Sequence, residues 1–440
     1  MSKKVTVLGA GLVGTLLSIF LAKRGYNVHA YEGRPDLRKS QLEGGRSINL
    51  ALSHRGLKAL KAVGLEDEIK ARYIPMPGRM IHDTAGNLDF HPYGKEGQFI
   101  NSVSRSGLNE LLLNEAEKAG VYLHFEHRCN RVDHQTTTAY FTTPQGSIEV
   151  NSDFIFGADG AFSALRNSFM RTDRFNYEQH YITAGYKELH IPATTKGEFA
   201  MDPHALHIWP RGKFMLIALP NLDKSFTVTL FLPFEGENSF ASLQSPDQVL
   251  TFFNREFADA VPLMPDFVED FFSNPTSGLV TVRCYPWVKQ NCALIGDAAH
   301  AIVPFYGQGM NAGFEDCHVL NQLLEELGTL NAEVLSRYQE LRKPDAEAIA
   351  DLALYNFIEM RDKVADPKFV LQKKIEKRLN ELYPNQWLPL YSMVTFSDLR
   401  YSEALEIGRK QQKIMDKVME QESLEEHWES LDFESIVRQL

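Results

Sequence analysis

Cysteine is scarce in this sequence, with four residues in a chain of 440. The four positions, Cys129, Cys284, Cys292 and Cys317, show no C-x-x-C spacing and no pattern with histidine that is typical of a metal site. So few cysteines in so long a chain fit reduced thiols in a core better than a disulfide framework. We therefore expect no disulfide scaffold, no metal centre and a cytoplasmic protein.

Long hydrophobic runs are also missing. The longest apolar run near the N-terminus, Leu12 to Ala22, is interrupted by Gly and Ser and is shorter than the ~20 residues that a membrane-spanning helix needs. Met1 to Lys4 lead straight into the apolar Val5–Leu8, without the pattern of a signal peptide. These absences predict a soluble protein without a membrane anchor.

Positive charge is outweighed by negative charge. The chain has 46 Lys and Arg against 57 Asp and Glu, which gives a formal net charge of -11. Nucleic-acid binding needs a basic face, so this balance argues against a nucleic-acid partner. A small acidic substrate is still compatible, because one buried arginine can outweigh the overall sign.

Apolar residues, in contrast, are plentiful. Hydrophobic residues make up 44% of the chain and aromatic residues 11%, which is enough for a sizeable core and argues against global disorder. The length suits two domains that share an interface.

The order of the periodic segments predicts an α/β domain interrupted by a sheet. Val5–Leu8 and Tyr26–Glu32 read as strands around a helix at Gly11–Arg24, which is a βαβ opening. Further expected elements are helices at Leu57–Val63, Leu108–Lys118 and Gly309–Leu327, and strands at Phe154–Ala158 and Ala293–Asp297. Short β-rich runs separated by turn residues indicate an inserted antiparallel sheet, at Ala205–Trp209, Phe214–Leu219, Phe226–Leu232 and Leu279–Cys284. Beyond Asn331 the pattern is helical, with expected breaks at Pro344, Pro384 and Pro389.

From these segments we expect three regions. A discontinuous, Rossmann-like dinucleotide-binding domain would comprise residues 1–75, 97–180 and 280–343. A substrate-binding β-sheet domain would comprise 76–96 and 181–279, and a C-terminal helical region 344–440.

Gly9, Gly11 and Gly14 form a G-x-G-x-x-G turn between the first strand and the first helix. In a βαβ unit these glycines permit a tight turn, a close approach of the backbone to a pyrophosphate, and close helix–strand packing. Glu32 ends the second strand, where it would accept hydrogen bonds from the adenosine ribose and repel a 2′-phosphate. The turn predicts a site for FAD or NAD rather than NADP; the alternative is a glycine-rich turn that arose by coincidence.

A second segment, Gly296–His300 followed by Pro304–Asn311, narrows the cofactor to FAD. Asp297 closes a strand and would meet the ribityl hydroxyls. The helix that starts at Gly309 presents N–H groups without intrahelical partners, and Met310 and Asn311 would supply them to a reduced flavin. Tyr306 and Gln308 lie beside the expected reacting face and could tune it.

Two further features are weaker when taken alone. Asp159 lies in an acidic turn at a strand end, Gly157 to Gly160, which is either a plain turn or, beside the other two segments, a contact for the FAD pyrophosphate and an incoming nicotinamide. Arg105 starts a helix, where it is either a phosphate or ribose contact or an ordinary surface arginine.

Longer motifs carry a family resemblance. They are Gly44–Gly56, Pro75–His82, Ser102–Arg105, Gly296–Asp316, Tyr355–Arg361 and Pro389–Phe396. From Val5 to roughly Arg400 the chain resembles the single-component FAD-dependent aromatic hydroxylases, and within that family the members that act on L-kynurenine. Animal members continue into a membrane anchor after the last matching helix; this chain does not, so no anchor is expected here.

The resemblance implies a fold and a reaction. The fold would be of the p-hydroxybenzoate hydroxylase type: a Rossmann-like FAD domain, an inserted sheet and a C-terminal helical segment, as a monomer or homodimer. The reaction would be hydroxylation of L-kynurenine at ring C3, with non-covalent FAD and with NADPH and O2 as co-substrates. Oxygen would add at flavin C4a to give a hydroperoxide, and the cofactor rather than an obligatory side-chain base would carry the chemistry.

The resemblance also implies individual contacts. Arg79 would pair with the amino-acid carboxylate, Tyr93 would donate to it, and Asn356 and Tyr391 would complete the pocket. Met215 and Phe231 would wall the aniline ring, unless they are plain sheet core. Residues that would hold FAD, partly through backbone, are Val13, Tyr31, Glu32, Gly33, Arg34, Ala51 and Cys129. Only one arginine, Arg79, stands where relatives often have two, which weakens the case for a doubled anion clamp.

Two other functions stay open. A hydroxylase for another aromatic acid, such as a hydroxybenzoate, would leave Tyr93, Asn356 and Tyr391 without a role. A carrier or adaptor that keeps the fold but has lost flavin is the other alternative, and the presence of Glu32, Asp297 and the three glycines argues against it.

Overall fold

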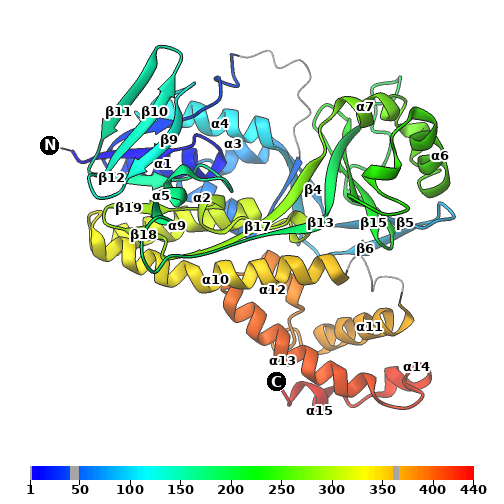
Figure 1. Ribbon diagram of the computed structural model, residues 1–440. Helices are drawn as coiled ribbons and strands as arrows, with labels where there is room; N and C mark the ends of the chain where they lie inside the picture. The colour runs from blue at the N-terminus through cyan, green and yellow to red at the C-terminus, as the bar shows by residue number, and fades with distance from the viewer. Residues whose placement is uncertain (1, 40–48, 360–365) are drawn as a thin grey trace.

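The computed structural model describes residues 2–39, 49–359 and 366–440. Of the motifs named above, residues 44–48 and 360–361 lie outside these ranges. Figure 1 shows an α/β part around the N-terminus, a second part built on a large sheet, and helices of the C-terminal region below them.

The α/β part is built on a six-stranded sheet in the order β18-β19-β12-β1-β2-β8. Neighbouring strands run parallel, except that β18 is antiparallel to β19. The central strand is buried because Val5, Val7 and Leu8 are apolar on both faces. The strands are β1 (Lys4–Leu8), β2 (Asn27–Tyr31), β8 (Tyr122–His124), β12 (Phe154–Gly157), β18 (Val288–Lys289) and β19 (Cys292–Leu294).

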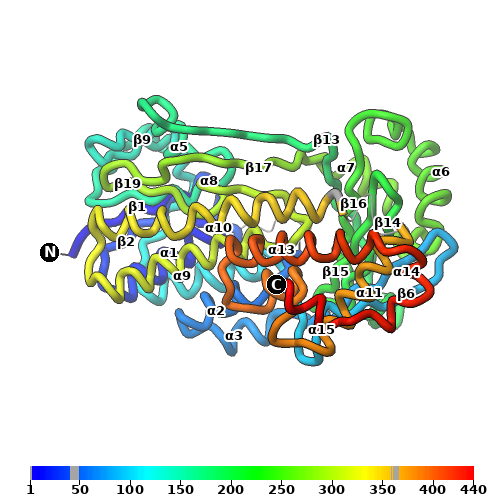
Figure 2. Tube along the Cα trace, turned by 90° about the horizontal axis from the view of Figure 1, so that it is seen from below, coloured from blue at the N-terminus to red at the C-terminus, as the bar shows by residue number. Residues whose placement is uncertain are grey.

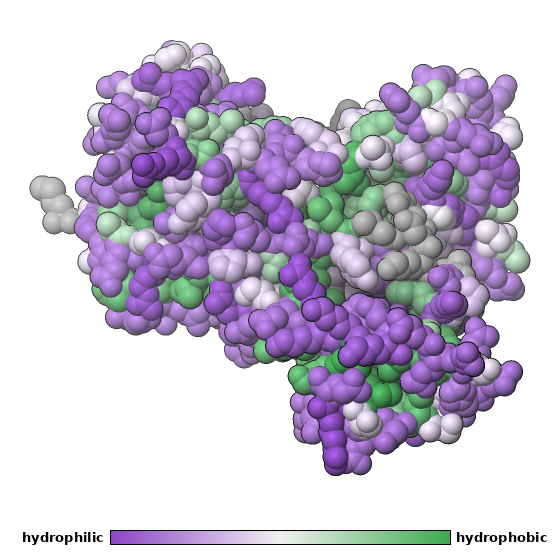
Figure 3. Space-filling model, turned by 60° about the horizontal axis from the view of Figure 1, so that its bottom comes forward, coloured by the Kyte–Doolittle hydropathy of each residue, from purple (hydrophilic) through white to green (hydrophobic). Residues whose placement is uncertain are grey.

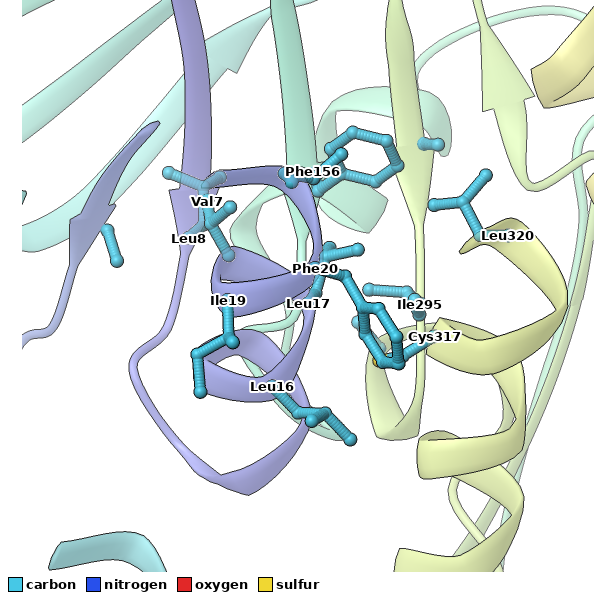
Figure 4. Packing of buried hydrophobic residues seen from close by; sticks show 14 of the residues in the cluster. Val7, Leu8, Leu16, Leu17, Ile19, Phe20, Phe156, Ile295, Cys317 and Leu320 are labelled. Atoms are coloured by element: carbon cyan, nitrogen blue, oxygen red, sulfur yellow. The ribbon is translucent and has the colours of Figure 1, made fainter. Parts of the chain in front are cut away.

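Helix α1 (Leu12–Lys23) packs against α4 (Arg105–Lys118) and α9 (Gly309–Leu327). Val7 of β1, Phe20 of α1 and Cys317 of α9 belong to one apolar cluster (Figure 4). The two segments that the sequence assigns to the cofactor therefore share a core, although they lie far apart in the chain. The helix predicted at Gly309–Leu327 is confirmed with the same bounds.

Two three-stranded sheets accompany the α/β part. In the first, the ring of Phe141 stacks on Tyr31 of β2 with centroids 4.4 Å apart. Its strands are β9 (Arg128–Asp133), β10 (Thr138–Thr143) and β11 (Gly146–Asn151). The second is formed by β3 (Asn49–Leu52), β7 (Ile100–Ser104) and β4 (Tyr73–Met76).

The second part is built on a seven-stranded sheet in the order β17-β13-β16-β15-β14-β5-β6. Its strands are β5 (Gly78–His82), β6 (Leu88–Pro92), β13 (Asn176–Ile191), β14 (Ala205–Arg211), β15 (Phe214–Pro220), β16 (Phe226–Pro233) and β17 (Ser277–Tyr285). The expectation of an antiparallel sheet needs one correction, because β5 and β14 run parallel. Strand β5 comes from an earlier stretch of chain and enters beside β14 in the same direction.

One face of this sheet is covered by α6 (Pro246–Glu256) and α7 (Phe267–Ser273), packed through Trp209, Phe253 and Phe267. The long strands β13 and β17 run from the α/β part into the sheet, and α10 (Ala332–Ile358) lies alongside them (Figures 1 and 2). These three elements tie the two parts together.

Helix α10 continues through Pro344, so the break predicted there is wrong. Arg342 and Asp345, on either side of the proline, are both buried and joined by an ion pair of 3.2 Å, which holds the helix through this point. The breaks expected at Pro384 and Pro389 do fall between helices. The remaining C-terminal helices are α11 (Pro367–Leu382), α12 (Leu390–Phe396), α13 (Tyr401–Met419), α14 (Leu424–His427) and α15 (Phe433–Val437).

Short helices complete the chain: α2 (His54–Ala62), α3 (Glu66–Lys70), α5 (Ala164–Phe169), α8 (Asp297–His300) and the 3-10 turns at Phe240–Ser242, Val261–Leu263, Pro304–Tyr306 and Trp428–Ser430. All four cysteines are unpaired. Hydrophilic residues dominate the face seen in Figure 3, with hydrophobic patches between them. Within the described ranges, none of the helices combines the length and apolarity needed to span a bilayer.

Candidate active site

A cavity of about 930 Å³ lies between the α/β part and the seven-stranded sheet. This is near the upper end of the ~300–1,000 Å³ that ligand pockets occupy. Most predicted site residues line it: Gly9, Gly11, Val13, Tyr31, Glu32, Gly33, Arg34, Ala51, Arg79, Tyr93, Arg105, Cys129, Asp159, Met215, Phe231, Asp297, Tyr306, Gly309, Met310 and Tyr391. The other four, Gly14, Gln308, Asn311 and Asn356, lie behind its wall.

At one end of the cavity the three glycines have different surroundings. Gly9 has a φ of +92°, and a Cβ there would lie 2.5 Å from the carbonyl oxygen of Ala158. A Cβ on Gly14 would lie 2.0 Å from the carbonyl oxygen of Gly9. A Cβ on Gly11 would meet no atom within 4 Å and lies at the cavity wall. Gly9 and Gly14 therefore allow the turn and its packing, and Gly11 leaves the backbone open to a ligand.

Glu32 lies beside this turn. Its Oε2 accepts a hydrogen bond from the Ala10 N–H at 3.1 Å, and its Oε1 accepts from Nε of Arg34 at 2.9 Å. Burial alone would raise the pKa of Glu32, but the bonds from Arg34 and Ala10 hold it below its ordinary value. The carboxylate therefore stays ionised at the edge of the cavity, where the turn predicts a ribose.

Positive charge gathers at the same end. Arg34, Arg105 and Arg128 all line the cavity, and Arg105 is the first residue of α4. The carboxylate of Asp159 accepts a hydrogen bond from the Ala164 N–H at 2.7 Å, and burial raises its pKa. Arg34 is already paired with Glu32, so Arg105 and Arg128 are the guanidinium groups that suit the two negative charges of a pyrophosphate.

Cys129 is a wall residue rather than a reactive thiol. Burial, aided by the nearby Asp159, raises the pKa of this thiol to about 12, so it is neutral at physiological pH. Tyr31, at the end of β2, is held between the rings of His124 and Phe141, each with centroids 4.4 Å away. These side chains fix the backbone of the wall.

The middle of the cavity is bounded by α8 and the start of α9. Asp297 begins α8 and is exposed at the cavity. Behind it, Oδ2 of the fully buried Asp316 accepts from the Gly296 N–H at 3.1 Å and bonds Nε2 of His300 at 2.5 Å. Nε of Arg342 donates to the other oxygen of Asp316 at 2.7 Å. This buried cluster holds Asp297 in place.

The first backbone bond of α9 runs from the Ala312 N–H to the carbonyl oxygen of Gln308 at 2.8 Å. The N–H groups of Gly309, Met310 and Asn311 precede it and have no place in the helical ladder. Gly309 and Met310 also line the cavity. The helix start therefore presents donors and the positive end of its dipole there.

The side chain of Asn311 has a second role that the sequence did not indicate. Its Oδ1 accepts from the Ser53 N–H at 2.9 Å, and its Nδ2 donates to the carbonyl oxygens of Ala51 and Gly307 at 2.8 and 2.9 Å. These bonds fasten the start of α9 to β3 and to the preceding turn. The open backbone at Gly11, the arginines and these helix donors together fit a dinucleotide with an electron-rich ring system, such as FAD.

The opposite end of the cavity contains Arg79 beside a stacked pair of aromatic rings. The rings of Tyr93 and Tyr391 stack with centroids 5.2 Å apart, and the guanidinium carbon of Arg79 lies 5.0 Å from each. Nε of Arg79 and the hydroxyl of Tyr93 are buried without a hydrogen-bond partner in the described part of the chain. Tyr306 stacks on Tyr391 at 5.5 Å. A cation and unpaired donors here suit a carboxylate ligand.

The tyrosines of this end are neutral donors. Burial raises the pKa of Tyr93, Tyr306 and Tyr391 above the ordinary value of a phenol. Burial opposes the charge of Arg79, yet its pKa lies above the ordinary value of a guanidinium group, so Arg79 stays ionised.

An apolar wall completes this end. Met215 of β15 and Phe231 of β16 are paired across the sheet, and both are buried and line the cavity. Phe231 also contacts Phe305, with ring centroids 5.1 Å apart. Wall residues that the sequence analysis missed are Leu206, Ile208, Ile217, Leu219 and Thr229. Their period-two alternation along three strands is the signal that could have found them.

Two predicted residues point away from the cavity. The Oε1 of Gln308, which is 1% exposed, accepts from the hydroxyl of Tyr401 at 2.8 Å. Nδ2 of Asn356 donates to the carbonyl oxygen of Phe305 at 2.7 Å. Both side chains therefore hold the Phe305–Gln308 turn from behind.

Comparisons with known proteins agree with this geometry. The FAD binding domain family matches residues 2–353. The kynurenine 3-monooxygenase of Flavobacterium psychrophilum is 50% identical over 100% of this chain and 98% of its own length. That of Christiangramia forsetii is 50% identical over 98% of this chain and 97% of its own length.

Among solved structures, the tetrameric form of 2-methyl-3-hydroxypyridine-5-carboxylic acid oxygenase superposes with a TM-score of 0.69 at 21% identity, covering 84% of this chain and 95% of that chain. This likeness confirms the predicted fold class of an FAD-binding domain with an inserted sheet. The chain belongs to the kynurenine 3-monooxygenase family of FAD-dependent monooxygenases.

Proposed function

We propose that this protein hydroxylates L-kynurenine at ring C3, using NADPH and O2, with FAD bound non-covalently. The observation that carries the proposal is a single cavity with a dinucleotide turn at one end and Arg79 beside the stacked rings of Tyr93 and Tyr391 at the other. Curated relatives with the name of this activity are 50% identical over nearly the whole chain.

The cofactor would lie along the α/β wall. Gly9 to Gly14, Glu32 and Arg34 would hold the adenosine and pyrophosphate, Asp297 the ribityl chain, and the start of α9 the ring. When bound, FAD would supply electron transfer from NADPH and the activation of O2. The sequence has one glycine-rich nucleotide turn, so NADPH would deliver its hydride and leave.

The substrate would lie along the sheet wall. Arg79 and Tyr93 would bind its carboxylate, and Tyr391 would close over the same group. Met215, Phe231 and Phe305 would hold the aniline ring and exclude water from it. The ring carbon beside the aromatic amine is electron-rich, so no side chain need remove a proton to make it reactive. Asn356 would act by holding the Phe305 turn.

We propose that cofactor binding and substrate binding belong to different domains, with the boundaries predicted from the sequence. Residues 1–75, 97–180 and 280–343 would bind the cofactor, and 76–96 with 181–279 would bind the substrate. The presence of both β5 and β6 in the seven-stranded sheet supports assigning 76–96 to the substrate domain. Tyr391 would bring the region 344–440 into the same pocket.

One assay tests the proposal. Purified protein loaded with FAD is mixed with NADPH in air, and NADPH oxidation, 3-hydroxykynurenine and hydrogen peroxide are measured together, with L-kynurenine and separately with 4-hydroxybenzoate. We expect hydroxylated product only with L-kynurenine. Hydroxylated product from 4-hydroxybenzoate but not from L-kynurenine would show that the proposed substrate is wrong. A colourless protein that cannot be reconstituted with FAD would show that the chain is a flavin-free adaptor and not an enzyme.

A further inference from the structure

Tyr401, the first residue of α13, reaches the turn that precedes α9. Its side chain is fully buried, and its hydroxyl donates to Oε1 of Gln308 at 2.8 Å. Gln308 occupies the N-cap position of α9, without a capping bond from its side chain, and is 1% exposed. A hydrogen bond between two such buried groups is costly to lose, because water cannot replace the missing partner.

The bond from Tyr401 is the shortest that the Gln308 amide makes. The other contact of this amide is the hydroxyl of Ser53, which lies 3.4 Å from Nε2 and 3.5 Å from Oε1. The backbone N–H of Ser53 in turn donates to Asn311. The turn at Gly307 and Gln308 is thereby held on one side by Asn311 and on the other by Tyr401.

The turn also has little freedom to move. Gly307 has a φ of +66°, and a Cβ there would lie 3.1 Å from the Cβ of Ala51. Ala51 and Gly307 both line the cavity beside Gly309 and Met310. A small shift of the turn would therefore carry the first N–H groups of α9 with it.

Arg55 of α2 holds Tyr401 in place. Its guanidinium carbon lies 4.0 Å from the centre of the Tyr401 ring. Nε of Arg55 donates to the carbonyl oxygen of Val394 at 3.1 Å, and its other nitrogens bond the carbonyl oxygen of Leu399 and the carboxylate of Glu315. Arg55 is 3% exposed, so these are buried, charge-assisted bonds. These bonds connect helix α9 with the segment that runs from α12 into α13.

We propose that Tyr401 is a positioning residue: through Gln308 it sets the turn and the N-terminus of α9 against the cofactor ring, and Arg55 keeps it oriented. The same short segment carries Tyr391, which lines the substrate end of the cavity. The C-terminal helices thus contribute to both ends of the cavity, with Tyr401 acting at the cofactor end. This inference rests on the proposed function for its turnover readout only.

Tyr401→Phe tests the proposal, because it keeps the ring and its contact with Arg55 and removes only the donor. We expect the FAD dissociation constant to rise at least fivefold, measured by flavin fluorescence on the apoprotein. We also expect the fraction of oxidised NADPH that ends as hydrogen peroxide to at least double. The KM for L-kynurenine should change less than twofold, because Arg79, Tyr93 and Tyr391 are untouched.

Tyr338→Phe is the matched control, since Tyr338 is also fully buried and its hydroxyl donates to the carbonyl oxygen of Leu294 at 3.3 Å. It should leave the FAD dissociation constant within twofold of the wild-type value. Combining Tyr401→Phe with Gln308→Leu should weaken FAD binding no more than Gln308→Leu alone, because Gln308→Leu already removes the bond between Tyr401 and Gln308.

A folded Tyr401→Phe variant with unchanged FAD affinity and peroxide fraction would overturn the inference. The same holds if Tyr338→Phe weakens FAD as much, since that reports general loss of a buried hydroxyl. If the wild-type protein does not hydroxylate L-kynurenine, the proposed function fails, while the FAD titrations still decide the role of Tyr401.

Discussion

At the scale of single residues, two glycines of the first turn have different roles, one in folding and one in binding. A Cβ on Gly14 meets the carbonyl oxygen of Gly9 at 2.0 Å, whereas a Cβ on Gly11 meets nothing within 4 Å. The two positions look equivalent in the sequence motif, yet their surroundings differ. Gly14 is needed because the fold has no room for a side chain there, whereas Gly11 is needed because it leaves space for a ligand.

Two alanine substitutions use this difference. Gly14→Ala should lower the free energy of unfolding of the apoprotein by roughly 1–3 kcal/mol, as overpacking does. Gly11→Ala should change that free energy by less than about 1 kcal/mol but raise the FAD dissociation constant at least tenfold, because its methyl group enters the cavity. Urea unfolding and flavin fluorescence measure the two effects. Equal changes in stability and in FAD affinity for the two variants would contradict the different roles assigned to Gly11 and Gly14.

Arg79 supplies the second prediction at this scale. Arg79→Ala removes the cation beside Tyr93 and Tyr391 and should raise the KM for L-kynurenine at least tenfold, in line with ~1.5–3 kcal/mol for a charged hydrogen bond. FAD affinity should not change. The KM of Arg79→Lys should fall between those of the wild type and Arg79→Ala, because lysine keeps the charge but lacks the planar fork of the guanidinium group.

Arg255→Ala is a suitable control, since Arg255 lies on α6, which covers the sheet that contains Arg79, and its side chain is 55% exposed. Its KM should match the wild-type value. A KM unchanged in Arg79→Ala would remove Arg79 from the substrate pocket.

Which residues the sequence could assign depended on how local their signal is. The glycine turn and the start of α9 are encoded in a few adjacent positions between a strand and a helix, so their place was predictable. The stacking of Tyr93 on Tyr391 requires β6 and α12 to meet, and no spacing encodes that. The direction of the Gln308 side chain depends on Tyr401, which the sequence did not single out.

At the scale of elements, the start of α9 depends on one side chain. Asn311 makes three hydrogen bonds of 2.8–2.9 Å, to β3, to Ser53 just before α2 and to the turn that precedes α9. The helix bounds were predictable from hydrophobic spacing, but this attachment was not, because asparagine near a helix start is equally typical of a solvent-exposed cap.

Asn311→Ala should therefore affect both stability and cofactor binding. It leaves the buried Ser53 N–H without its partner and removes the part-buried bonds to the carbonyl oxygens of Ala51 and Gly307, at a cost of roughly 2–4 kcal/mol in the free energy of unfolding. FAD affinity should fall as well, because the helix start loses its anchor. Urea unfolding of the apoprotein and flavin titration provide the measurements.

Asn109→Ala gives the comparison. Asn109 is buried on α4, and its Oδ1 has no hydrogen-bond partner within the described ranges. Its removal should cost less than about 1.5 kcal/mol and leave FAD affinity unchanged. An Asn311→Ala variant no worse than Asn109→Ala would show that the three bonds do not anchor the helix.

For the whole molecule, stability should depend on pH through buried histidine. Burial lowers the pKa of His207 from 6.5 to about 4. Between these values the unfolded chain binds a proton that the folded chain does not, so stability falls as the pH drops from 7 to 5. His207 is 2% exposed and lies on β14 of the seven-stranded sheet, among His82, Asp259 and Asp202.

The free energy of unfolding of the wild-type protein should decrease by roughly 1–2 kcal/mol from this residue between pH 7 and pH 5. His207→Gln should show a correspondingly smaller decrease over the same interval, whatever its absolute stability. Urea unfolding at both pH values measures it. If His207→Gln lost as much stability as the wild type between pH 7 and pH 5, the pH dependence of stability would arise from other groups.

The interleaved strand order of the first sheet has a consequence during synthesis. Strand β1 lies between β2 and β12, and β12 begins only at Phe154. At ~5–20 residues per second, the ribosome needs roughly 7–30 s to deliver that neighbour after β1 has emerged. Throughout that interval Val5, Val7 and Leu8 present an apolar strand edge that other nascent chains could pair with. Chaperone supply during translation should therefore govern the yield of this protein in a host cell.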